Sequence, residues 1–320
     1  VSSPRTELHW VCDVDGDRAD RAALPFRGVE ATATLDDVLD DERVEAVAIA
    51  TPASTHRALA LRCFTAGRHV LLEKPIATDV AEAESIIASA EEQGVVLMCD
   101  HTYCYTPAVR KIRELVHGDE VGHVRYVDSV RINLGLVQPD IDVFWDLAPH
   151  DLSILDTILV PEDRPIAVSA TAADPIGTGR ACVGYLSLPL ARGGIAHLHV
   201  NWLSPTKVRR VIVGGSRRTV LWDDVAPSQR LSVFDRGVDR ADPADDEQRR
   251  AAFVSYRSGD MVAPALPEVE ALSLVVAELA DAVRERRSPA TDGRQGLRVL
   301  QSLAAAEKSL AANGALVEIS

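Results

Sequence analysis

The sequence predicts an α/β protein in which a parallel sheet with crossover helices is followed by a mostly antiparallel sheet. Two apolar runs, Val44–Ala50 and His69–Leu72, flank a segment of helical period, which is typical of a βαβ unit with two buried parallel strands. From residue 123 onward, short runs alternate apolar and polar residues between Gly, Pro and Asp turns, as antiparallel strands do. We therefore expect two domains, at residues 1–101 and 102–320.

The first strand, Leu8–Cys12, ends at the acidic residue Asp13. In a dinucleotide-binding sheet, an acid at the end of the second strand accepts hydrogen bonds from the adenosine ribose, and its charge disfavours the 2′-phosphate of NADP. Asp13 is therefore a candidate ligand of NAD, with NADP the less favoured cofactor. Thr34 then caps a short acidic helix, and the strand after it ends at Thr51 and Pro52.

The next strand also ends in polar residues. A crossover helix stops at Gly67, and the strand that follows runs into Glu73, Lys74 and Pro75. Ligands of open α/β sheets bind beyond the carboxyl ends of the strands. We therefore expect the chemistry of this domain at Thr51 and at the Glu-Lys-Pro segment.

One more helix and strand complete the first domain. The helix begins with a capping box of Asp79 and Glu82 and ends at Gly94. The strand Val95–Met98 follows, and the domain boundary is expected at its tip, near His101.

The second domain opens with a helix, Pro107–His117, that has proline in its first turn and glycine after it. Phe234–Arg250 mixes acids, arginines and a proline, and is expected to be an exposed loop. Two helices, about Glu268–Arg286 and Gly293–Ala312, close the chain. Between these parts lie six β-rich runs: His123–Leu134, Ile166–Ala173, Cys182–Leu190, Gly194–Leu203, Val208–Val213 and Thr219–Trp222.

Composition excludes several classes of protein. The net charge of −14 argues against nucleic acid and anionic membranes as partners, because both demand a basic face. No apolar run reaches the roughly 18–20 residues of a membrane span, and the N-terminus lacks a signal-peptide core. Five scattered cysteines without a CxxC motif indicate thiols in a reducing cytoplasm. His197 and His199 share one face of a strand, but no third ligand accompanies them, so we expect no metal site.

A second polar cluster combines Asp146 and His150. Pro149 suits the first turn of a helix whose apolar face Leu152 and Ile158 continue, which puts Asp146 at or just before the N-cap. The two polar side chains then lie one turn apart and can share a site. The spacing alone also fits a structural role, with Asp146 as a helix cap and His150 as a polar first-turn residue.

These motifs resemble those of the glucose-fructose oxidoreductase/inositol dehydrogenase (Gfo/Idh/MocA) family, and the resemblance covers nearly the whole chain from Leu8. It implies a Rossmann-type parallel sheet followed by an α+β domain with a mostly antiparallel sheet. The open face of that sheet often makes the oligomer interface, which implies a homodimer or homotetramer. The family fingerprint is carried by Thr51, Pro52, His56, Gly67, His69, Val70, Glu73, Lys74 and Pro75.

The resemblance also implies an active site. Inositol-dehydrogenase-like members have an Asp-x-x-x-His pair that acts with the lysine of the Glu-Lys-Pro motif, and Asp146, His150 and Lys74 match this pattern. Alcohol oxidation needs a base for the hydroxyl proton, and histidine titrates near neutral pH. A helix N-terminus would favour the neutral imidazole and Asp146 the imidazolium, so their balance is open. Lys74 would stabilise negative charge on the substrate oxygen, with an ion pair to Glu73 as its structural alternative.

Other residues are expected around the cofactor and the substrate. Thr51 and Pro52 would border the cofactor cleft, and the resemblance implies that Glu73 contacts the nicotinamide ribose. Tyr103 and Tyr105 follow the last strand of the first domain and could line a sugar pocket, with core packing as the alternative.

The glycine-rich phosphate loop of a dinucleotide-binding fold should lie about 20 residues before the ribose-binding acid. Only twelve residues precede Asp13, and no GxGxxG motif occurs in the sequence. Because Val1 fits a GTG start codon, we expect that the start of the gene is assigned too late. A truncated paralogue is the alternative.

Together these features predict an NAD-dependent oxidoreductase. It would transfer a hydride between nicotinamide and a ring hydroxyl or ketone of a sugar, nucleotide-sugar or cyclitol. The segment Ile132–Asp140 and the residues after it resemble the branch encoded with nucleotide-sugar pathways. Two alternatives remain open: an NAD-dependent glycosidase that works through a transient ketone, and a non-catalytic binder without the phosphate loop.

Overall fold

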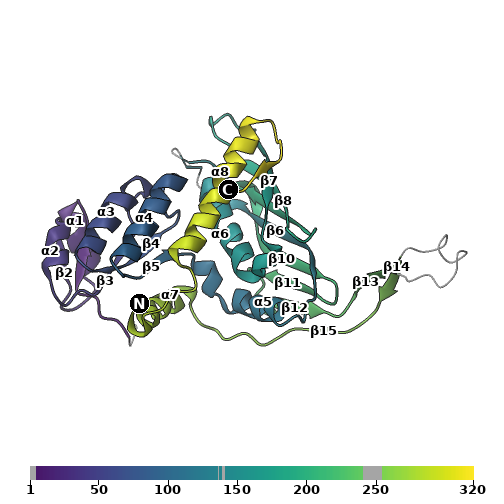
Figure 1. Cartoon of the computed structure of the whole chain (residues 1–320), viewed down its shortest axis with the longest axis horizontal. Helices are drawn as coiled ribbons and strands as arrows, with labels where there is room; N and C mark the ends of the chain where they lie inside the picture. Colours follow the sequence, from purple (N-terminus) through teal and green to yellow (C-terminus); the bar gives the residue numbers. More distant parts are fainter. Residues whose placement is uncertain (1–4, 136, 139–140, 241–253) are drawn as a thin grey trace, which may run out of the picture. The chain divides into compact units, whose positions relative to one another are not determined.

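The computed structural model describes residues 5–135, 137–138, 141–240 and 254–320. The chain divides into two compact units. Unit 1 contains Val1–Thr102 and Glu270–Leu300, and unit 2 contains Tyr103–Val269 and Gln301–Ser320. Figure 1 traces both from the purple N-terminus to the yellow C-terminus.

Unit 1 is built on two small parallel sheets. One pairs β1 with β2, and the other has the order β3-β4-β5. The predicted βαβ unit is confirmed, because the crossover helix α3 (Ala53–Thr65) joins two adjacent parallel strands. The strands are β1 (Trp10–Cys12), β2 (Glu30–Thr32), β3 (Ala46–Ile49), β4 (His69–Glu73) and β5 (Leu97–Asp100).

The two strands of this βαβ unit are not buried equally. Strand β4 buries Val70, Leu71 and Leu72, whereas β3 buries Ile49 and exposes Ala48. Within the described residues β3 pairs with β4 alone, so one edge of its hydrogen-bond ladder has no partner strand. The expectation of two fully buried strands is therefore wrong for β3.

The fourth helix begins at the cap that the sequence predicts, whereas Thr34, the N-cap residue of the second, makes no capping hydrogen bond through its side chain. Asp79 Oδ1 accepts from the backbone N–H of Glu82 at 2.9 Å, which confirms Asp79 as the N-cap, whereas the Glu82 carboxylate accepts from Thr78 Oγ1 at 2.6 Å. Gly67 and Gly94, which follow α3 and α4, both have positive φ. The helices are α1 (Gly16–Ala23), α2 (Leu35–Asp40), α3, α4 (Val80–Glu92) and α7 (Ala271–Glu285).

The segment Glu270–Leu300 belongs to unit 1, whereas the sequence places it in the domain 102–320. Cys99 N donates to Thr291 O at 2.8 Å, and Thr291 Oγ1 donates to Cys99 O at 2.7 Å. These bonds attach the loop before α8 (Gly293–Ala311) to β5. Strand β5 also runs to Asp100, beyond the predicted end at Met98.

Unit 2 contains a nine-stranded sheet in the order β15-β12-β11-β10-β6-β9-β8-β7-β16. The prediction of a mostly antiparallel sheet is confirmed, because β6 and β9 form its only parallel pair among the described residues. The strands are β6 (Val124–Leu134), β7 (Ala167–Ala173), β8 (Val183–Pro189), β9 (Ile195–Asn201), β10 (Leu203–Gly215), β11 (Thr219–Asp223), β12 (Leu231–Phe234), β15 (Met261–Val262) and β16 (Val317–Glu318).

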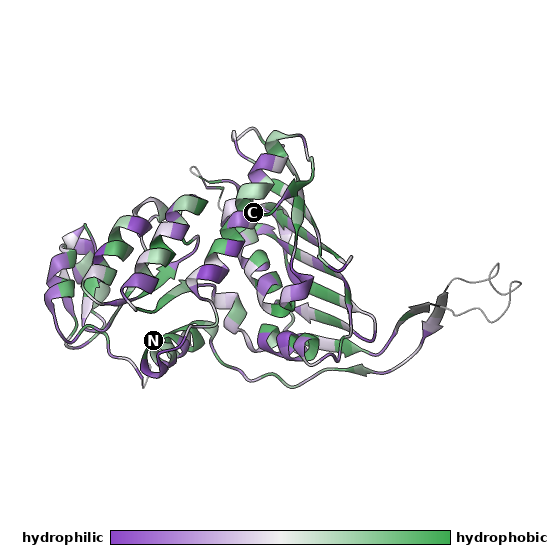
Figure 2. Cartoon of the chain, in the orientation of Figure 1, coloured by the Kyte–Doolittle hydropathy of each residue, from purple (hydrophilic) through white to green (hydrophobic). Residues whose placement is uncertain are grey.

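Two helices, α5 (Pro107–His117) and α6 (Val143–Ile158), pack together in unit 2, and α6 lies against β6, β8 and β9. Hydrophobic residues recur along these elements (Figure 2). The predicted bounds of α5 are confirmed. Thr106 caps the helix by accepting from the backbone N–H of Val109, and Pro107 is its first residue. The short helical turns are η1 (Thr102–Tyr105) and η2 (Pro161–Asp163).

The predicted loop Phe234–Arg250 contains a strand. β13 (Gly237–Arg240) pairs antiparallel with β14 (Val254–Arg257). Residues 241–253 lie outside the described residues. In the ranges that the structure describes, no helix is both long enough and apolar enough to cross a membrane.

Candidate active site

Helix α6 positions the Asp146–His150 pair. Asp142 is its N-cap, and its carboxylate accepts from the N–H groups of Phe144 at 2.9 Å and Trp145 at 3.1 Å. The helix therefore begins six residues before Pro149, and the prediction of Pro149 in the first turn is wrong. Asp146 lies in the first turn, and His150 follows one turn later on the same face.

This earlier start changes the electrostatics expected at His150. The helix macrodipole acts within the first turn, where Asp146 lies. His150 lies in the second turn, and Pro149 before it removes one helical hydrogen bond to the carbonyl of Trp145. The helix N-terminus therefore acts on Asp146 rather than on His150.

Asp146 is oriented by a buried tryptophan. Trp202, which is 1% exposed, donates its indole N–H to Asp146 Oδ2 at 2.9 Å. Trp145 on the same helix donates its own indole N–H to Glu307 Oε1 at 2.6 Å. Asp146 is thus a hydrogen-bonded, half-buried carboxylate and not the helix cap.

Tyr103 lies beside His150, as the prediction of a shared substrate pocket requires. The ring centroids are 5.1 Å apart at an interplanar angle of 65°, and Tyr103 also lies 6.4 Å from the ring of Trp222. Tyr105 is placed differently. It is 1% exposed and its ring is covered by the Arg110 guanidinium at 5.3 Å, so it forms part of the core of unit 2.

An ion pair that the sequence did not reveal fixes α6 on the sheet. Asp151 accepts from Arg131 Nε at 2.6 Å, from Arg131 Nη2 at 3.1 Å and from Ser129 Oγ at 2.8 Å. All three side chains are buried. Burial lowers the pKa of Arg131, but the carboxylate of Asp151 more than compensates and holds that pKa above its usual range. The available signal was weak: an acid next to His150, and two polar residues at alternate positions of a strand that also carries other polar residues.

In unit 1, Asp13 follows β1 as predicted. Its Oδ1 accepts from the backbone N–H of Asp15 at 2.9 Å, and its Oδ2 lies 3.4 Å from Arg18 Nη1. The Asp13 side chain is 27% exposed. A carboxylate held at the end of a strand and partly open to solvent is suited to accept hydrogen bonds from a ribose.

Thr51 and Pro52 follow β3, and both are exposed. Thr51 Oγ1 lies 2.7 Å from Thr55 Oγ1, and Pro52 is the N-cap residue of α3. His56 is 1% exposed, with its ring nitrogens 2.9 Å from Thr51 O and 3.1 Å from Pro75 O. His56 therefore ties together the segments that follow β3 and β4.

Glu73 and Lys74 stand at the carboxyl end of β4. Glu73 pairs in register with Asp100 of β5, and its Oε2 accepts from the backbone N–H of Lys74 at 2.8 Å. Burial, and then the charge of Asp100, raise the pKa of Glu73, and burial raises that of Asp100. The peptide bond between Lys74 and Pro75 is cis. Thr51, Glu73 and Lys74 are thus all found at the carboxyl edge of the parallel strands, as expected.

Comparisons with known proteins agree with this geometry. The family model GFO_IDH_MocA, described as an oxidoreductase family with an NAD-binding Rossmann fold, matches residues 1–101. UDP-N-acetylglucosamine 3-dehydrogenase of Acidithiobacillus ferrooxidans is 29% identical over 304 residues, which cover 92% of this chain and 87% of that protein. Its crystal structure matches with a TM-score of 0.78 at 28% identity, over 95% of this chain and 89% of that one.

Two further relatives extend the comparison. The scyllo-inositol 2-dehydrogenase (NADP(+)) IolW of Bacillus subtilis is 22% identical over 307 residues, or 91% of this chain and 84% of that protein. GenD2 from gentamicin A biosynthesis, solved in complex with NAD, matches with a TM-score of 0.80 at 26% identity, over 99% of this chain and 90% of that one.

Residues 1–101 thus match the Gfo/Idh/MocA oxidoreductase family, and two relatives that cover most of the chain are dehydrogenases.

NAD is the cofactor of this family's Rossmann fold. Unit 1 has two carboxylates of the kind that accept hydrogen bonds from the two ribose groups of NAD. Asp13 offers a partly exposed carboxylate after β1, and Glu73 offers a second carboxylate after β4. Carboxylates at strand ends are the acceptors that ribose hydroxyls require. We assign no described residue to the pyrophosphate.

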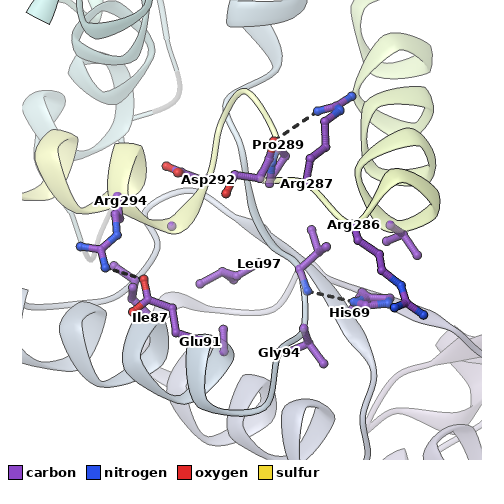
Figure 3. A pocket seen from close by; sticks show the side chains of 16 residues that line it. His69, Ile87, Glu91, Gly94, Leu97, Arg286, Arg287, Pro289, Asp292 and Arg294 are labelled. Atoms are coloured by element: carbon purple, nitrogen blue, oxygen red, sulfur yellow. Dashed lines mark hydrogen bonds and ion pairs between the residues drawn. The ribbon is translucent and has the colours of Figure 1, made fainter.

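A cavity of about 500 Å³ lies in unit 1, away from these residues (Figure 3). It opens at the first residues of β4 and β5, His69 and Leu97, between the end of α4 and the loop from α7 to α8. His69 Nδ1 accepts there from the backbone N–H of Val96 at 2.9 Å. The cavity is at the amino ends of the strands, opposite to Glu73 and Asp100, and no predicted site residue lines it.

Proposed function

We propose that this chain is an NAD-dependent dehydrogenase of the Gfo/Idh/MocA family that oxidises a ring hydroxyl of a sugar, nucleotide-sugar or cyclitol, or reduces the corresponding ketone. The proposal is carried by one observation. His150 stands on α6 with Tyr103 against its ring and with Asp146, oriented by Trp202, one turn before it. An imidazole beside an aromatic ring and a fixed carboxylate is suited to move the proton of a bound hydroxyl.

The proposed roles follow from what alcohol oxidation requires. Bound NAD supplies the hydride acceptor. The imidazole of His150 takes the hydroxyl proton during oxidation and returns it during reduction. Asp146, one turn away, stabilises the imidazolium that results. The ammonium group of Lys74 donates to the substrate oxygen and stabilises its developing negative charge. Tyr103 provides an apolar wall with one polar atom, which suits a sugar ring.

Relatives support the substrate class. The Acidithiobacillus ferrooxidans relative is a UDP-N-acetylglucosamine 3-dehydrogenase, and the Bacillus subtilis relative is a scyllo-inositol 2-dehydrogenase. The first relative has the higher sequence identity to this chain, 29% against 22%. We therefore favour a nucleotide-sugar over a cyclitol as the substrate. We expect NAD to be preferred over NADP, because the carboxylate of Asp13, which follows β1, would repel a 2′-phosphate bound there.

Initial rates of NADH formation with UDP-N-acetylglucosamine and with scyllo-inositol test the proposal. We expect turnover of at least one of the two, and a loss of about 10²–10⁴-fold in kcat for His150→Asn, the usual contribution of a general base. His117→Asn, at the exposed end of α5, is the matched control and should keep full activity. Equal rates for both variants would contradict the role of His150. Release of an aglycone without net NADH would favour the glycosidase alternative.

The open face of the unit 2 sheet supports a proposed homodimer or homotetramer. Tyr126, Tyr185 and Ile195 are 39%, 51% and 39% exposed on neighbouring strands β6, β8 and β9. His199 stacks on Tyr185 there at 4.4 Å, so this face carries packed aromatic groups. Light scattering of the purified chain should give twice or four times the monomer mass, and a monomer would contradict the proposal. None of the five cysteines, all of which the structure describes, forms a disulfide bond, which fits the proposed cytoplasmic location.

A further inference from the structure

Two arginines lie directly opposite each other on the central strands of unit 2. Arg131 of β6 pairs in register with Arg209 of β10. Like charges in this arrangement repel each other, so the pair needs compensation. Ser129 and Arg131 point to the face of the sheet that α6 covers, and the buried Val211 of β10, which pairs with Ser129, points to the same face. Arg209 lies on that face too, because it is two residues from Val211.

The compensation is unequal. Arg131 is 3% exposed and both of its donor nitrogens that face Asp151 are hydrogen-bonded. Arg209 is 30% exposed, and its nearest acid, Asp224, is 3.7 Å from Nη1, beyond a normal hydrogen bond. Its buried Nε has no hydrogen-bond partner among the described residues. Arg209 is therefore a positively charged side chain whose Nε has no acceptor among the described residues.

The same tyrosine connects this arginine with the proposed base. Arg209 Cζ lies 5.7 Å from the centroid of the Tyr103 ring, and Arg131 Cζ lies 4.3 Å from it. The ring of His150 lies 5.1 Å from Tyr103. The Tyr103 ring therefore lies close to both the proposed base and Arg209.

We propose that Arg209 binds an anionic group of the substrate, which rests on the proposed function for the identity of the sugar. The group is either the diphosphate of a nucleotide-sugar or the carboxylate of a sugar acid, since a guanidinium offers paired donors to both. Arg131 does not suit this role, because it is buried and its Nε and Nη2 already donate to the counterion Asp151. A neutral cyclitol would leave Arg209 without a ligand, so the arginine selects anionic sugars.

Calorimetric titration of the full chain with UDP, with glucuronate and with myo-inositol tests the assignment without requiring turnover. The matched variants are Arg209→Gln and Arg210→Gln. Arg210 is the next residue, faces the other side of the sheet and pairs with the partly exposed Asp223 at 2.8 Å. We expect Arg209→Gln to lower the affinity for the anion by about 10- to 100-fold, the usual loss for a hydrogen bond to a charged group. Arg210→Gln should bind as the wild type does.

The ligand arms separate the two sources of charge. UDP binding that depends on Arg209 assigns the diphosphate, and glucuronate binding that depends on it assigns the carboxylate. Equal affinities of the two glutamine variants, or no anion binding by the wild type, overturns the proposal. If Arg209→Gln does not fold, Arg209→Lys against Arg210→Lys decides, because lysine keeps the charge and loses the paired donors. Arg209-dependent UDP binding in a chain that forms no NADH would uphold this site and reject the proposed function.

Discussion

At the residue scale, the Arg131–Asp151 pair sets the rotation of α6 and therefore the direction of His150. Both side chains are 3% exposed, and Ser129 supplies a further hydrogen bond to the carboxylate. A buried ion pair need not stabilise a fold relative to apolar residues, but removal of one partner leaves an uncompensated charge. The pair therefore serves to position α6, and a single substitution in it is expected to destabilise the fold.

We predict that Asp151→Asn lowers the free energy of unfolding by about 3–5 kcal/mol, because it leaves Arg131 buried without a counterion. Asp223→Asn, which removes the partly exposed partner of Arg210, should cost about 0–1 kcal/mol. Urea denaturation of the three proteins measures both values. Equal losses for the two variants would show that Asp151 is not a buried counterion.

The facing carboxyls of Glu73 and Asp100 make a second residue-scale feature. Their pKa values are raised mainly by burial, so the folded state binds these protons more tightly than the unfolded state. The stability of unit 1 therefore decreases as the pH rises from the ordinary carboxyl range through the raised values.

Glu73→Gln should remove part of this penalty. We expect its melting temperature to exceed that of the wild type by about 2–4 °C at about pH 8, and the difference to vanish below about pH 3, where an ordinary carboxyl is protonated in both states. Glu92→Gln, at the exposed end of α4, should show no such pH-dependent difference. A Glu73→Gln protein less stable than the wild type at high pH would refute this explanation.

At the element scale, α6 is the clearest case of a correct element with a wrong start. The sequence indicated the helix and the Asp146–His150 spacing, but proline is favoured in a first turn, and that preference pointed to Pro149. The cap at Asp142 and the burial of Val143 and Phe144 outweigh the loss of one hydrogen bond at Pro149. Helices such as α5, where cap, proline and terminal glycine agree, were predicted within their true bounds.

The packing of α6 on β8 yields a prediction about Gly184. A Cβ atom there would lie 2.3 Å from Cζ of the buried Phe144, so the ring or the helix must move. We expect Gly184→Ala to destabilise the fold by about 1–3 kcal/mol. Gly16→Ala, where no atom lies within 4 Å of the added group, should be neutral or slightly stabilising. Thermal unfolding of both variants is the measurement, and an unaffected Gly184→Ala protein would show that α6 adapts freely.

At the scale of the whole molecule, the fold class and the order of the elements were predictable because they follow from periodicity, caps and turns. The assignment of Glu270–Leu300 to unit 1 was not, since the bonds between Cys99 and Thr291 join positions about 190 residues apart and leave no periodic trace. For the same reason the sequence indicated Asp146, His150 and Tyr103 but missed Arg131, Asp151 and Arg209. These last three depend on the register between strands and a helix.

Hydride transfer itself is the central claim, and isotope labelling tests it most directly. The enzyme would be incubated with NAD⁺ and a nucleotide-sugar that carries deuterium on its ring carbons, and the NADH and the sugar would be analysed by mass spectrometry. We predict one deuterium in NADH for each ketone formed, and no detectable transfer with His150→Asn. Unlabelled NADH, or a sugar that keeps its deuterium and loses its aglycone, would contradict a dehydrogenase.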